Sequence, residues 1–187
     1  MAPARRLFTV DEFLRMAQAG VFQPDDRLEL VEGEILQMAP IGSAHAACVA
    51  HLTHAFARLA HQALVSVQNP IRVSERSLLQ PDLALLRPRE DFYAAEHPGP
   101  PDVLLPVEVA DTTLAYDRDV KVPLYARAGI PEVWLVDLEG RAVWVYREPG
   151  PGGYGWVRRF ARRERFAPAA FPDFELAAEE VLGGPSN

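Results

Sequence analysis

The sequence predicts a mixed α/β (α+β) domain in which helices flank one central mixed β-sheet. Two short apolar runs, Val103–Ala110 and Glu132–Asp137, have the length and composition of buried strands. Apolar residues recur at helical spacing over residues 44–63, before these runs, and a helical segment over 118–128 separates them. One sheet with helices packed on it accounts for strands and helices in this order.

The first elements along the chain are a helix and a hairpin. Thr9 and Glu12 form the capping box of a helix that runs to about Gln18. Residues 27–36 carry apolar side chains on both sides of Gly33, which predicts two short strands joined by a turn.

The middle of the chain adds the long helix and two further strands. Ser43 is placed to cap the helix over 44–63. Residues 64–73 are rich in β-forming residues, and residues 81–86 predict a short strand that opens with Asp82. The proline-rich, polar segment 87–101 predicts a loop.

The C-terminal part predicts a hairpin and a tail. Residues 141–147 and 154–160 form the two strands of the hairpin around a Pro-Gly turn, and residues 167–181 read as a weakly structured tail that ends in a short helix. We expect a single domain over 1–187, with a core at about 5–147 and the added C-terminal hairpin and tail over 148–187.

Composition places the protein among ordinary globular proteins. Its 187 residues are 49% hydrophobic and 24% charged, which is enough for one sizeable core. No apolar run reaches the roughly 18 residues of a membrane span, and the N-terminus lacks the apolar segment of a signal peptide. Cys48 is the only cysteine, so no intrachain disulfide is possible, and we expect a cytoplasmic protein.

Charge limits the function classes. The net charge of −7 argues against a broad, non-specific nucleic-acid binder, but it permits a nuclease whose substrate contacts are local. Among nineteen basic residues only Lys121 is a lysine. In a chain that otherwise uses arginine, this position is either a chance survivor or one that needs a compact ammonium group.

Two carboxylates are hard to explain as packing. Glu108 lies between valines in the most apolar strand, and Asp82 directly follows a proline at a strand start. A charge in a buried strand is very costly unless it is paired or bound to a metal. The structural explanation is an ion pair between Glu108 and Lys121, or an edge strand with Glu108 in water.

The functional explanation is a site for Mg²⁺ or Mn²⁺, which prefer hard oxygen ligands. Asp82, Glu108 and the carbonyl of Val109 would hold the metal, and a metal-activated water would attack a phosphodiester. Lys121 would orient that water and stabilise charge growing on the phosphate.

The ordered set Pro81-Asp82, Val107–Ala110 and Asp117 to Lys121 resembles the PD-(D/E)XK nuclease superfamily, and more narrowly the bacterial Uma-type restriction endonucleases. Further matching segments lie at 29–33, His45 and 128–137, so the resemblance covers about residues 5–146. It implies a restriction endonuclease-like fold, a divalent metal, nucleic acid as substrate and a homodimer. The superfamily lysine two residues after the glutamate is replaced by Ala110, and the Uma-type pattern moves it to the next helix, where Lys121 lies.

The resemblance also points to supporting residues. Glu29 matches a glutamate that assists the metal site, against a reading as an exposed strand residue. His45 would reach the site or hold a phosphate, Gln68 either lines the site or lies at a sheet edge, and Tyr125 would lie behind Lys121.

Other polar residues favour structural roles. Asp117 either holds Lys121 or caps its helix, and we favour the cap. Glu32 and Glu34 are expected to face solvent, as are three histidines without nearby zinc ligands: His51, His54 and His61. The arginines Arg158, Arg159, Arg162 and Arg163 either contact a nucleic-acid backbone or form a solvated hairpin end.

These observations predict a metal-dependent endonuclease that cleaves phosphodiesters, with DNA as the expected substrate. The alternative is a catalytically inactive module on the same fold that binds nucleic acid or protein. The presence of Asp82, Glu108 and Lys121 together counts against that alternative.

Overall fold

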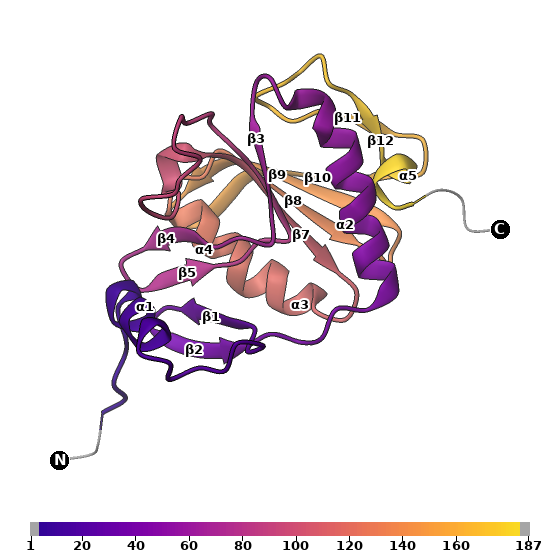
Figure 1. Ribbon diagram of the computed structural model, residues 1–187. Coiled ribbons are helices and arrows are strands. Elements are labelled where there is room, and N and C mark those ends of the chain that lie inside the picture. Colours follow the sequence, from indigo (N-terminus) through magenta and orange to yellow (C-terminus); the bar gives the residue numbers. More distant parts are fainter. Residues whose placement is uncertain (1–3, 184–187) are drawn as a thin grey trace.

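The computed structural model describes residues 4–183, whose strands form two main sheets (Figure 1). The larger sheet has the strand order β10-β9-β8-β7-β6-β3. Its neighbouring strands are antiparallel except for β7 and β8, which run parallel. The strands are β3 (Leu64–Val67), β6 (Leu83–Leu86), β7 (Val103–Ala110), β8 (Glu132–Asp137), β9 (Ala142–Gly150) and β10 (Gly153–Ala161). This sheet confirms the predicted mixed α/β fold.

A second, antiparallel sheet has the order β2-β1-β5-β4. The hairpin predicted at Gly33 is present, formed by β1 (Leu28–Val31) and β2 (Glu34–Gln37). Glu32 and Gly33 have φ values of 49° and 88°, as a two-residue turn with both central residues left-handed requires. The hairpin lies in this second sheet, so the prediction of one sheet for all strands was wrong.

The β-rich segment 64–73 is divided between the two sheets. Gln68 has a φ of 52°, and the chain turns there between β3 and β4 (Ile71–Ser74). β4 then pairs with β5 (Ser77–Leu79), which the sequence pattern did not predict. A local hydrophobic pattern does not reveal that consecutive strands change sheets, because both are apolar.

Helix α1 (Val10–Gln18) begins as predicted. Thr9 Oγ1 accepts the backbone N–H of Glu12, and Glu12 accepts the backbone N–H of Thr9 in return. Val10 and Phe13 pack against Leu30 of the second sheet.

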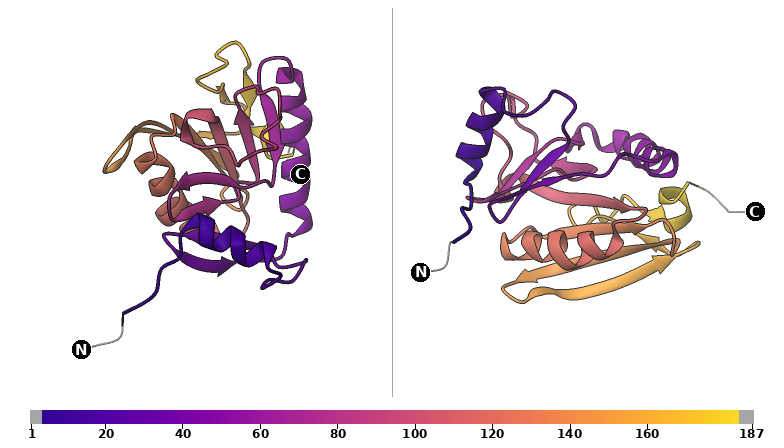
Figure 2. Two further views of the ribbon diagram at one scale, coloured as in Figure 1. Left: turned by 60° about the vertical axis from the view of Figure 1, so that its left-hand side comes forward. Right: turned by 90° about the horizontal axis from the view of Figure 1, so that it is seen from below.

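Helix α2 (Ser43–Phe56) covers one face of the six-stranded sheet, and Figure 2 shows it lying along that face. Gly42, in extended conformation, is the N-cap, so Ser43 is the first helical residue and not the cap that the sequence predicted. The predicted helix also ends early, because a 3₁₀ turn, η1 (Ala57–Leu59), follows Phe56 and Leu59 enters the core.

The opposite face of the sheet is covered by a second helical segment. It consists of α3 (Leu114–Tyr116), the π-helical turn η3 (Asp117–Lys121) and α4 (Val122–Arg127). The helix therefore starts before residue 118, where the sequence placed it. In η3 the Val122 N–H bonds to the carbonyl of Asp117 five residues back, and this wider turn accommodates Pro123 within the helix.

The C-terminal hairpin is part of the central sheet, because β9 pairs with β8 along its length. It is thus not an addition to a finished core. The tail after it is more structured than predicted, with β11 (Arg165–Phe166) pairing β12 (Leu176–Ala177) before α5 (Ala178–Val181). Phe166, Phe174 and Leu176 pack in the core beneath α2, which the composition of the tail alone did not indicate.

The predicted loop over 87–101 is confirmed up to the short 3₁₀ turn η2 (Pro100–Asp102). None of the helices within residues 4–183 combines the length and apolar character needed to cross a bilayer. The outer ends of the predicted domain, residues 1–3 and 184–187, lie outside the described part of the chain.

Candidate active site

The site is built where β6 begins beside the end of β7. Leu83, the first residue of β6, pairs with Val107, and Asp82 lies directly before it rather than within the strand. The Asp82 carboxylate accepts the backbone N–H of Val109 through Oδ2 at 2.8 Å. The Asp82 side chain thus continues the hydrogen bonding between the two strands beyond the first residue of β6, and this holds Asp82 beside Glu108.

His45 reaches the same carboxylate from the first turn of α2. Its Nε2 lies 3.0 Å from Asp82 Oδ1, and both side chains are 13% exposed. Asp82 is therefore held from two sides, by a strand amide and by an imidazole. The other ring nitrogen of His45, Nδ1, is buried and has no hydrogen-bond partner among the described residues.

Behind this pair lies a buried cluster around Lys121. The Lys121 ammonium is 2.8 Å from Glu108 Oε1 and 3.0 Å from Glu29 Oε1, and the carbonyl of Gln80 lies at 3.5 Å. Lys121, Glu108 and Glu29 are 1%, 2% and 0% exposed. The helix after β7 therefore packs back across the strand and brings Lys121 to Glu108, the geometry that the sequence left untested.

Tyr125 completes the cluster one turn further along α4. Its hydroxyl donates to Glu108 Oε1 at 2.5 Å, so one oxygen of Glu108 receives both the phenol and the ammonium. Glu29 Oε1 also accepts the backbone N–H of Gln80 at 2.6 Å, while Glu29 Oε2 is buried with no hydrogen-bond partner among residues 4–183.

Burial dominates the electrostatics of these groups. It raises the pKa of Glu108 well above its usual range, and the attraction of Lys121 offsets only part of that effect. Burial alone would lower the pKa of Lys121, but Glu108 and Glu29 outweigh it and raise that pKa. Burial, followed by the charge of Glu108, raises the pKa of Tyr125 well above its usual value.

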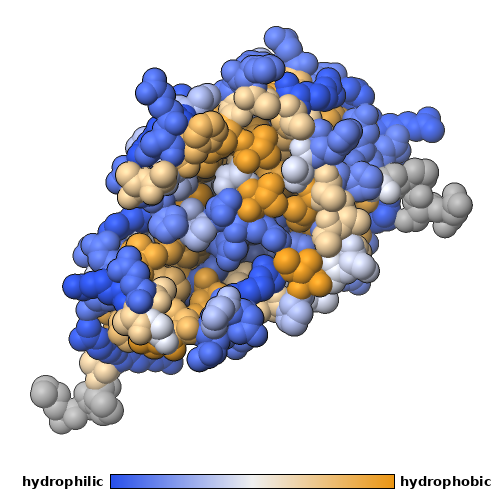
Figure 3. All heavy atoms as spheres, in the orientation of Figure 1, coloured by the Kyte–Doolittle hydropathy of each residue, from blue (hydrophilic) through white to orange (hydrophobic). Residues whose placement is uncertain are grey.

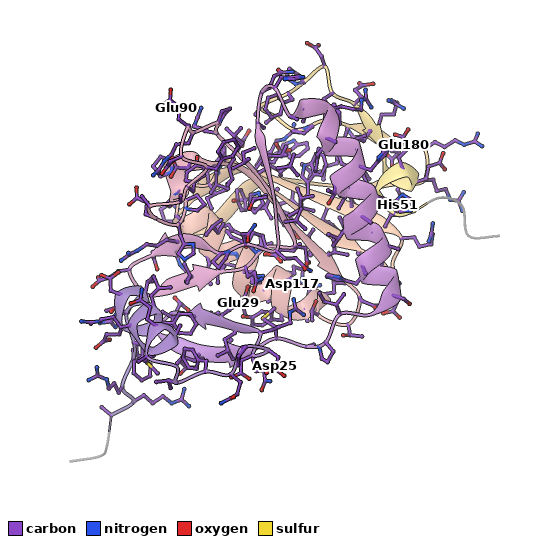
Figure 4. All side chains as sticks on the ribbon, in the orientation of Figure 1. Asp25, Glu29, His51, Glu90, Asp117 and Glu180 are labelled. Atoms are coloured by element: carbon purple, nitrogen blue, oxygen red, sulfur yellow. The ribbon has the colours of Figure 1, made fainter. Side chains whose placement is uncertain are left out.

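Asp117 adds another carboxylate at the first residue of η3. It is buried and accepts the Thr113 hydroxyl at 2.6 Å through Oδ2. The helix begins three residues earlier, so the prediction that Asp117 caps it was wrong. Burial raises the pKa of Asp117, with Lys121 and Thr113 offsetting part of the shift. Figure 4 shows Glu29 and Asp117 close together near the centre of the molecule.

These groups border a pocket that we call the acidic pocket. Its polar lining includes His45, Gln80, Asp82, Glu108, Asp111 and Asp117. Lys121 and Glu29 are not among its lining residues, so the ammonium lies behind Glu108 and not in the pocket. On the face shown in Figure 3, hydrophilic residues gather in the middle of the molecule, between areas where hydrophobic residues reach the surface.

The remaining predicted residues are placed as follows. Gln68 lies after the edge strand β3, and its backbone N–H donates to the carbonyl of Asp82 at 3.1 Å. Its backbone carbonyl accepts the side-chain amide of Gln80. Gln68 thus contacts the site through its backbone, and its side chain is not among those lining the acidic pocket. The exposed positions of Glu32, Glu34, His51, His54 and His61 agree with the sequence analysis.

Gln80 is the residue that the sequence analysis missed. It binds Glu29, lies within reach of Lys121 and lines the acidic pocket. The only local signal was its position next to Pro81-Asp82, which does not distinguish a site residue from a strand residue.

The arginines Arg158, Arg159, Arg162 and Arg163 lie on and after β10, away from the acidic pocket. Arg158 packs over the Phe160 ring and is 3.6 Å from Glu164. Arg159 donates to the carbonyl of Gly140 at 2.9 Å.

The donor chemistry of the pocket fits a hard cation. Of the four carboxylates that line it, Asp82 and Glu108 lie next to Val109, and Mg²⁺ typically takes one or two carboxylates along with carbonyl groups and waters. Three buried carboxylates, Glu29, Glu108 and Asp117, surround the single ammonium of Lys121, so the cluster carries more negative than positive charge when ionised. Within residues 4–183 no group of three or more His, Cys, Asp or Glu side chains is arranged to hold a metal. A cation here would therefore rely on two carboxylates and on non-side-chain ligands.

A mixed sheet flanked by helices, with Asp82, Glu108 and Lys121 meeting where β6 begins and β7 ends, is the arrangement that the resemblance to restriction endonuclease-like nucleases implies. The family model Uma2, described as "Putative restriction endonuclease", matches residues 10–179, and the chain belongs to that family.

The fold agrees with a solved structure. The chain is similar to a crystal structure described as a putative nuclease belonging to DUF820 from Anabaena variabilis, with a TM-score of 0.72 and 17% sequence identity. The match covers 94% of this chain and 97% of the other. No curated protein matches the sequence.

Proposed function

We propose that this protein is a divalent-metal-dependent endonuclease that hydrolyses phosphodiester bonds of DNA. The observation that carries the proposal is the convergence of Asp82 and Glu108 on one pocket, with Lys121 paired directly behind Glu108. Membership of a family described as restriction endonucleases supports a nucleic-acid substrate.

Asp82, Glu108 and the carbonyl of Val109 would hold Mg²⁺ or Mn²⁺. When bound, such a cation acidifies a water and neutralises charge on a phosphoryl oxygen. The hydrogen bond from Val109 N–H and the contact with His45 orient Asp82 toward this task.

Lys121 would be a positioning residue. Glu108, Glu29 and the carbonyl of Gln80 enclose the Lys121 ammonium. These three acceptors engage its three N–H donors, so none of the donors points into the pocket. We infer that Lys121 favours the ionised form of Glu108 and fixes one of its oxygens, while Tyr125 donates to that same oxygen. This replaces the direct action of Lys121 on the water that the functional explanation of the sequence predicted.

Three further predictions of the sequence stay part of the proposal. They are a single domain over residues 1–187, a cytoplasmic location, and a homodimer whose two sites address the two strands of a duplex.

The metal site is tested by thermal unfolding in EDTA and with increasing Mn²⁺. Saturation at about 100 times the dissociation constant stabilises a protein by about 2.7 kcal/mol, and 1 kcal/mol corresponds to about 2–4 °C for a chain of this size. We expect Mn²⁺ to raise the Tm of the wild type by about 5–10 °C. Asp82→Asn, whose carbonyl still accepts the Val109 N–H, should lose most of this rise.

Asp119→Ala is the matched control, because Asp119 is exposed and pairs only with its neighbour Arg118 among the described residues. An unchanged Tm of the wild type in Mn²⁺ would contradict the metal site. Plasmid nicking then separates enzyme from inactive binding module: the wild type should nick DNA in Mn²⁺, and Glu108→Gln should not. A wild type that binds Mn²⁺ but leaves the plasmid intact would favour the binding module.

A further inference from the structure

Positive charge is concentrated in one part of this acidic chain. Residues 137–165 contain seven arginines and four acidic residues, whereas the rest of the chain contains twelve basic and twenty-two acidic residues. A local basic segment in a protein of net charge −7 is where a polyanion would be attracted.

The strand register places this segment at the same end of the sheet as the acidic pocket. Ala110, at the end of β7, pairs with Asp137, which pairs with Ala142, which in turn pairs with Ala161 at the end of β10. Adjacent strands lie about 4.8 Å apart, so the end of β10 is about 14 Å from the end of β7. The C-terminal end of the basic segment and the acidic pocket therefore lie at the same end of the six-stranded sheet.

At this end of the sheet the chain forms a hollow that we call the arginine hollow. It is lined by four arginines, Arg141, Arg159, Arg162 and Arg163. Glu179 is the only acidic side chain lining it among residues 4–183, and it lies 3.9 Å from Arg163.

The β8–β9 and post-β10 turns hold the arginines in place. Arg159 is anchored to the carbonyl of Gly140 at 2.9 Å. Arg162 and Arg163 lie in a tight turn in which Glu164 N–H donates to the carbonyl of Ala161, and Glu164 Oε2 accepts the N–H of Ala161. Both of their side chains are exposed.

Several arginines outside the hollow are each paired with one acidic side chain. Examples are the pairs Arg5–Glu34, Arg6–Glu12, Arg72–Asp11, Arg118–Asp119 and Arg127–Glu32. In the arginine hollow, Arg159, Arg162 and Arg163 lie together with one carboxylate, that of Glu179. Guanidinium groups bind phosphate through paired hydrogen bonds, so several of them around one hollow favour contact with a phosphate backbone over a merely solvated hairpin end.

We propose that the arginine hollow binds backbone phosphates of duplex DNA on one side of the bond being cut. This inference rests on the proposed function, because it takes the acidic pocket as the place of cleavage. A separation of about 14 Å between the strand ends spans about four base-pair steps of 3.4 Å, so one duplex can reach both the pocket and the hollow. Arg158 is excluded from the hollow, since it packs over Phe160 instead.

The test measures binding of a labelled 20-base-pair duplex by fluorescence anisotropy in EDTA, where cleavage is prevented, between 50 and 200 mM salt. The variant is R162Q/R163Q, which leaves the anchored Arg159 in place. The matched control R76Q/R127Q removes the same charge from two arginines that line a different hollow, on the side of the second sheet.

We expect R162Q/R163Q to reduce the slope of log K against log salt by about 2, since each phosphate contact contributes about 0.9. The corresponding loss of affinity at 0.1 M salt is at least about tenfold. The control should keep the wild-type slope, and both variants should keep the wild-type Tm in EDTA.

Three outcomes would overturn the inference: a wild type that does not bind the duplex, a slope that R162Q/R163Q leaves unchanged, or an equal loss in the control. Tighter, arginine-dependent binding of single-stranded RNA would overturn its assignment to duplex DNA. If the wild type nicks DNA but neither binding nor nicking depends on these arginines, the role of the arginine hollow is contradicted and the proposed nuclease activity stands. If duplex binding depends on these arginines but Mn²⁺ neither stabilises the protein nor supports nicking, the proposed nuclease activity is contradicted and the arginine hollow remains a DNA-binding surface.

Discussion

The two faces of β7 are buried to the same degree but differ in chemistry. Leu105, Val107 and Val109 point to the face under α2, where the surrounding core is apolar. Glu108 points to the other face, where it meets Lys121 and Tyr125. Burying an apolar side chain stabilises by about 1.5–3 kcal/mol, whereas removing a charge from water costs several kcal/mol before its partner compensates.

This difference shows where the fold is specialised for function. An apolar side chain at position 108 would suit a buried strand better, and packing alone does not explain three carboxylates around one ammonium. Local conflict with the rules of stability is expected at functional sites. The predictions that follow test whether the two faces of β7 differ in this way.

The largest effect is expected from Lys121→Met. The change leaves Glu108 and Glu29 without their shared cation in a buried site, and breaking a buried ion pair in this way costs about 3–5 kcal/mol. Urea unfolding measures the free energy. Arg127→Met is the control, because Arg127 lies on the same helix and pairs with Glu32 at the same distance of 2.8 Å, but in the open. That exposed pair should contribute less than about 1 kcal/mol. Equal losses in the two variants would mean that burial does not govern the Lys121 pairs.

A slightly smaller loss of stability is expected from Leu105→Ala on the apolar face. Leu105 is fully buried, and its truncation leaves a cavity that costs about 3 kcal/mol. Because it does not touch the acidic pocket, the rise of Tm with Mn²⁺ should remain as large as in the wild type. Thermal unfolding with and without Mn²⁺ measures both quantities. If the response to Mn²⁺ disappeared here as in Asp82→Asn, the two faces would not be functionally separate.

The sequence was sufficient to predict the elements that have strong local patterns. β7 and β8 have the predicted bounds, since each is a continuous apolar run. The α1 cap and the turn at Gly33 were also predicted correctly, because Thr9, Glu12 and Gly33 act on their own neighbours.

What depends on long-range packing was not predicted. The chain changes sheets at Gln68, and Gln80 joins the site through Glu29, which is 51 positions away in the sequence. The role of Asp117 was misassigned because a π turn is not visible in a hydrophobic pattern. The position of Lys121 behind Glu108, rather than in the pocket, depends on how the helix crosses the sheet. Spacing along the chain contains no such information.

The smallest of the three effects is expected from Asp117→Asn and concerns pH. Burial raises the pKa of Asp117, so the folded protein holds its proton more tightly than the unfolded chain does. A raised pKa contributes stability that is complete below the unfolded value of about 3.9 and is lost as pH rises through the folded value. Asparagine does not titrate and still accepts the Thr113 hydroxyl through its carbonyl.

In EDTA, the wild type should therefore lose stability relative to Asp117→Asn as pH rises above about 4, and the difference should level off once Asp117 is ionised in the folded state. Thermal unfolding at intervals from pH 4 to pH 8 measures this difference. A wild type that gained stability over Asp117→Asn with rising pH would show that Lys121 already compensates Asp117, and that the charged face of β7 is balanced without a cation.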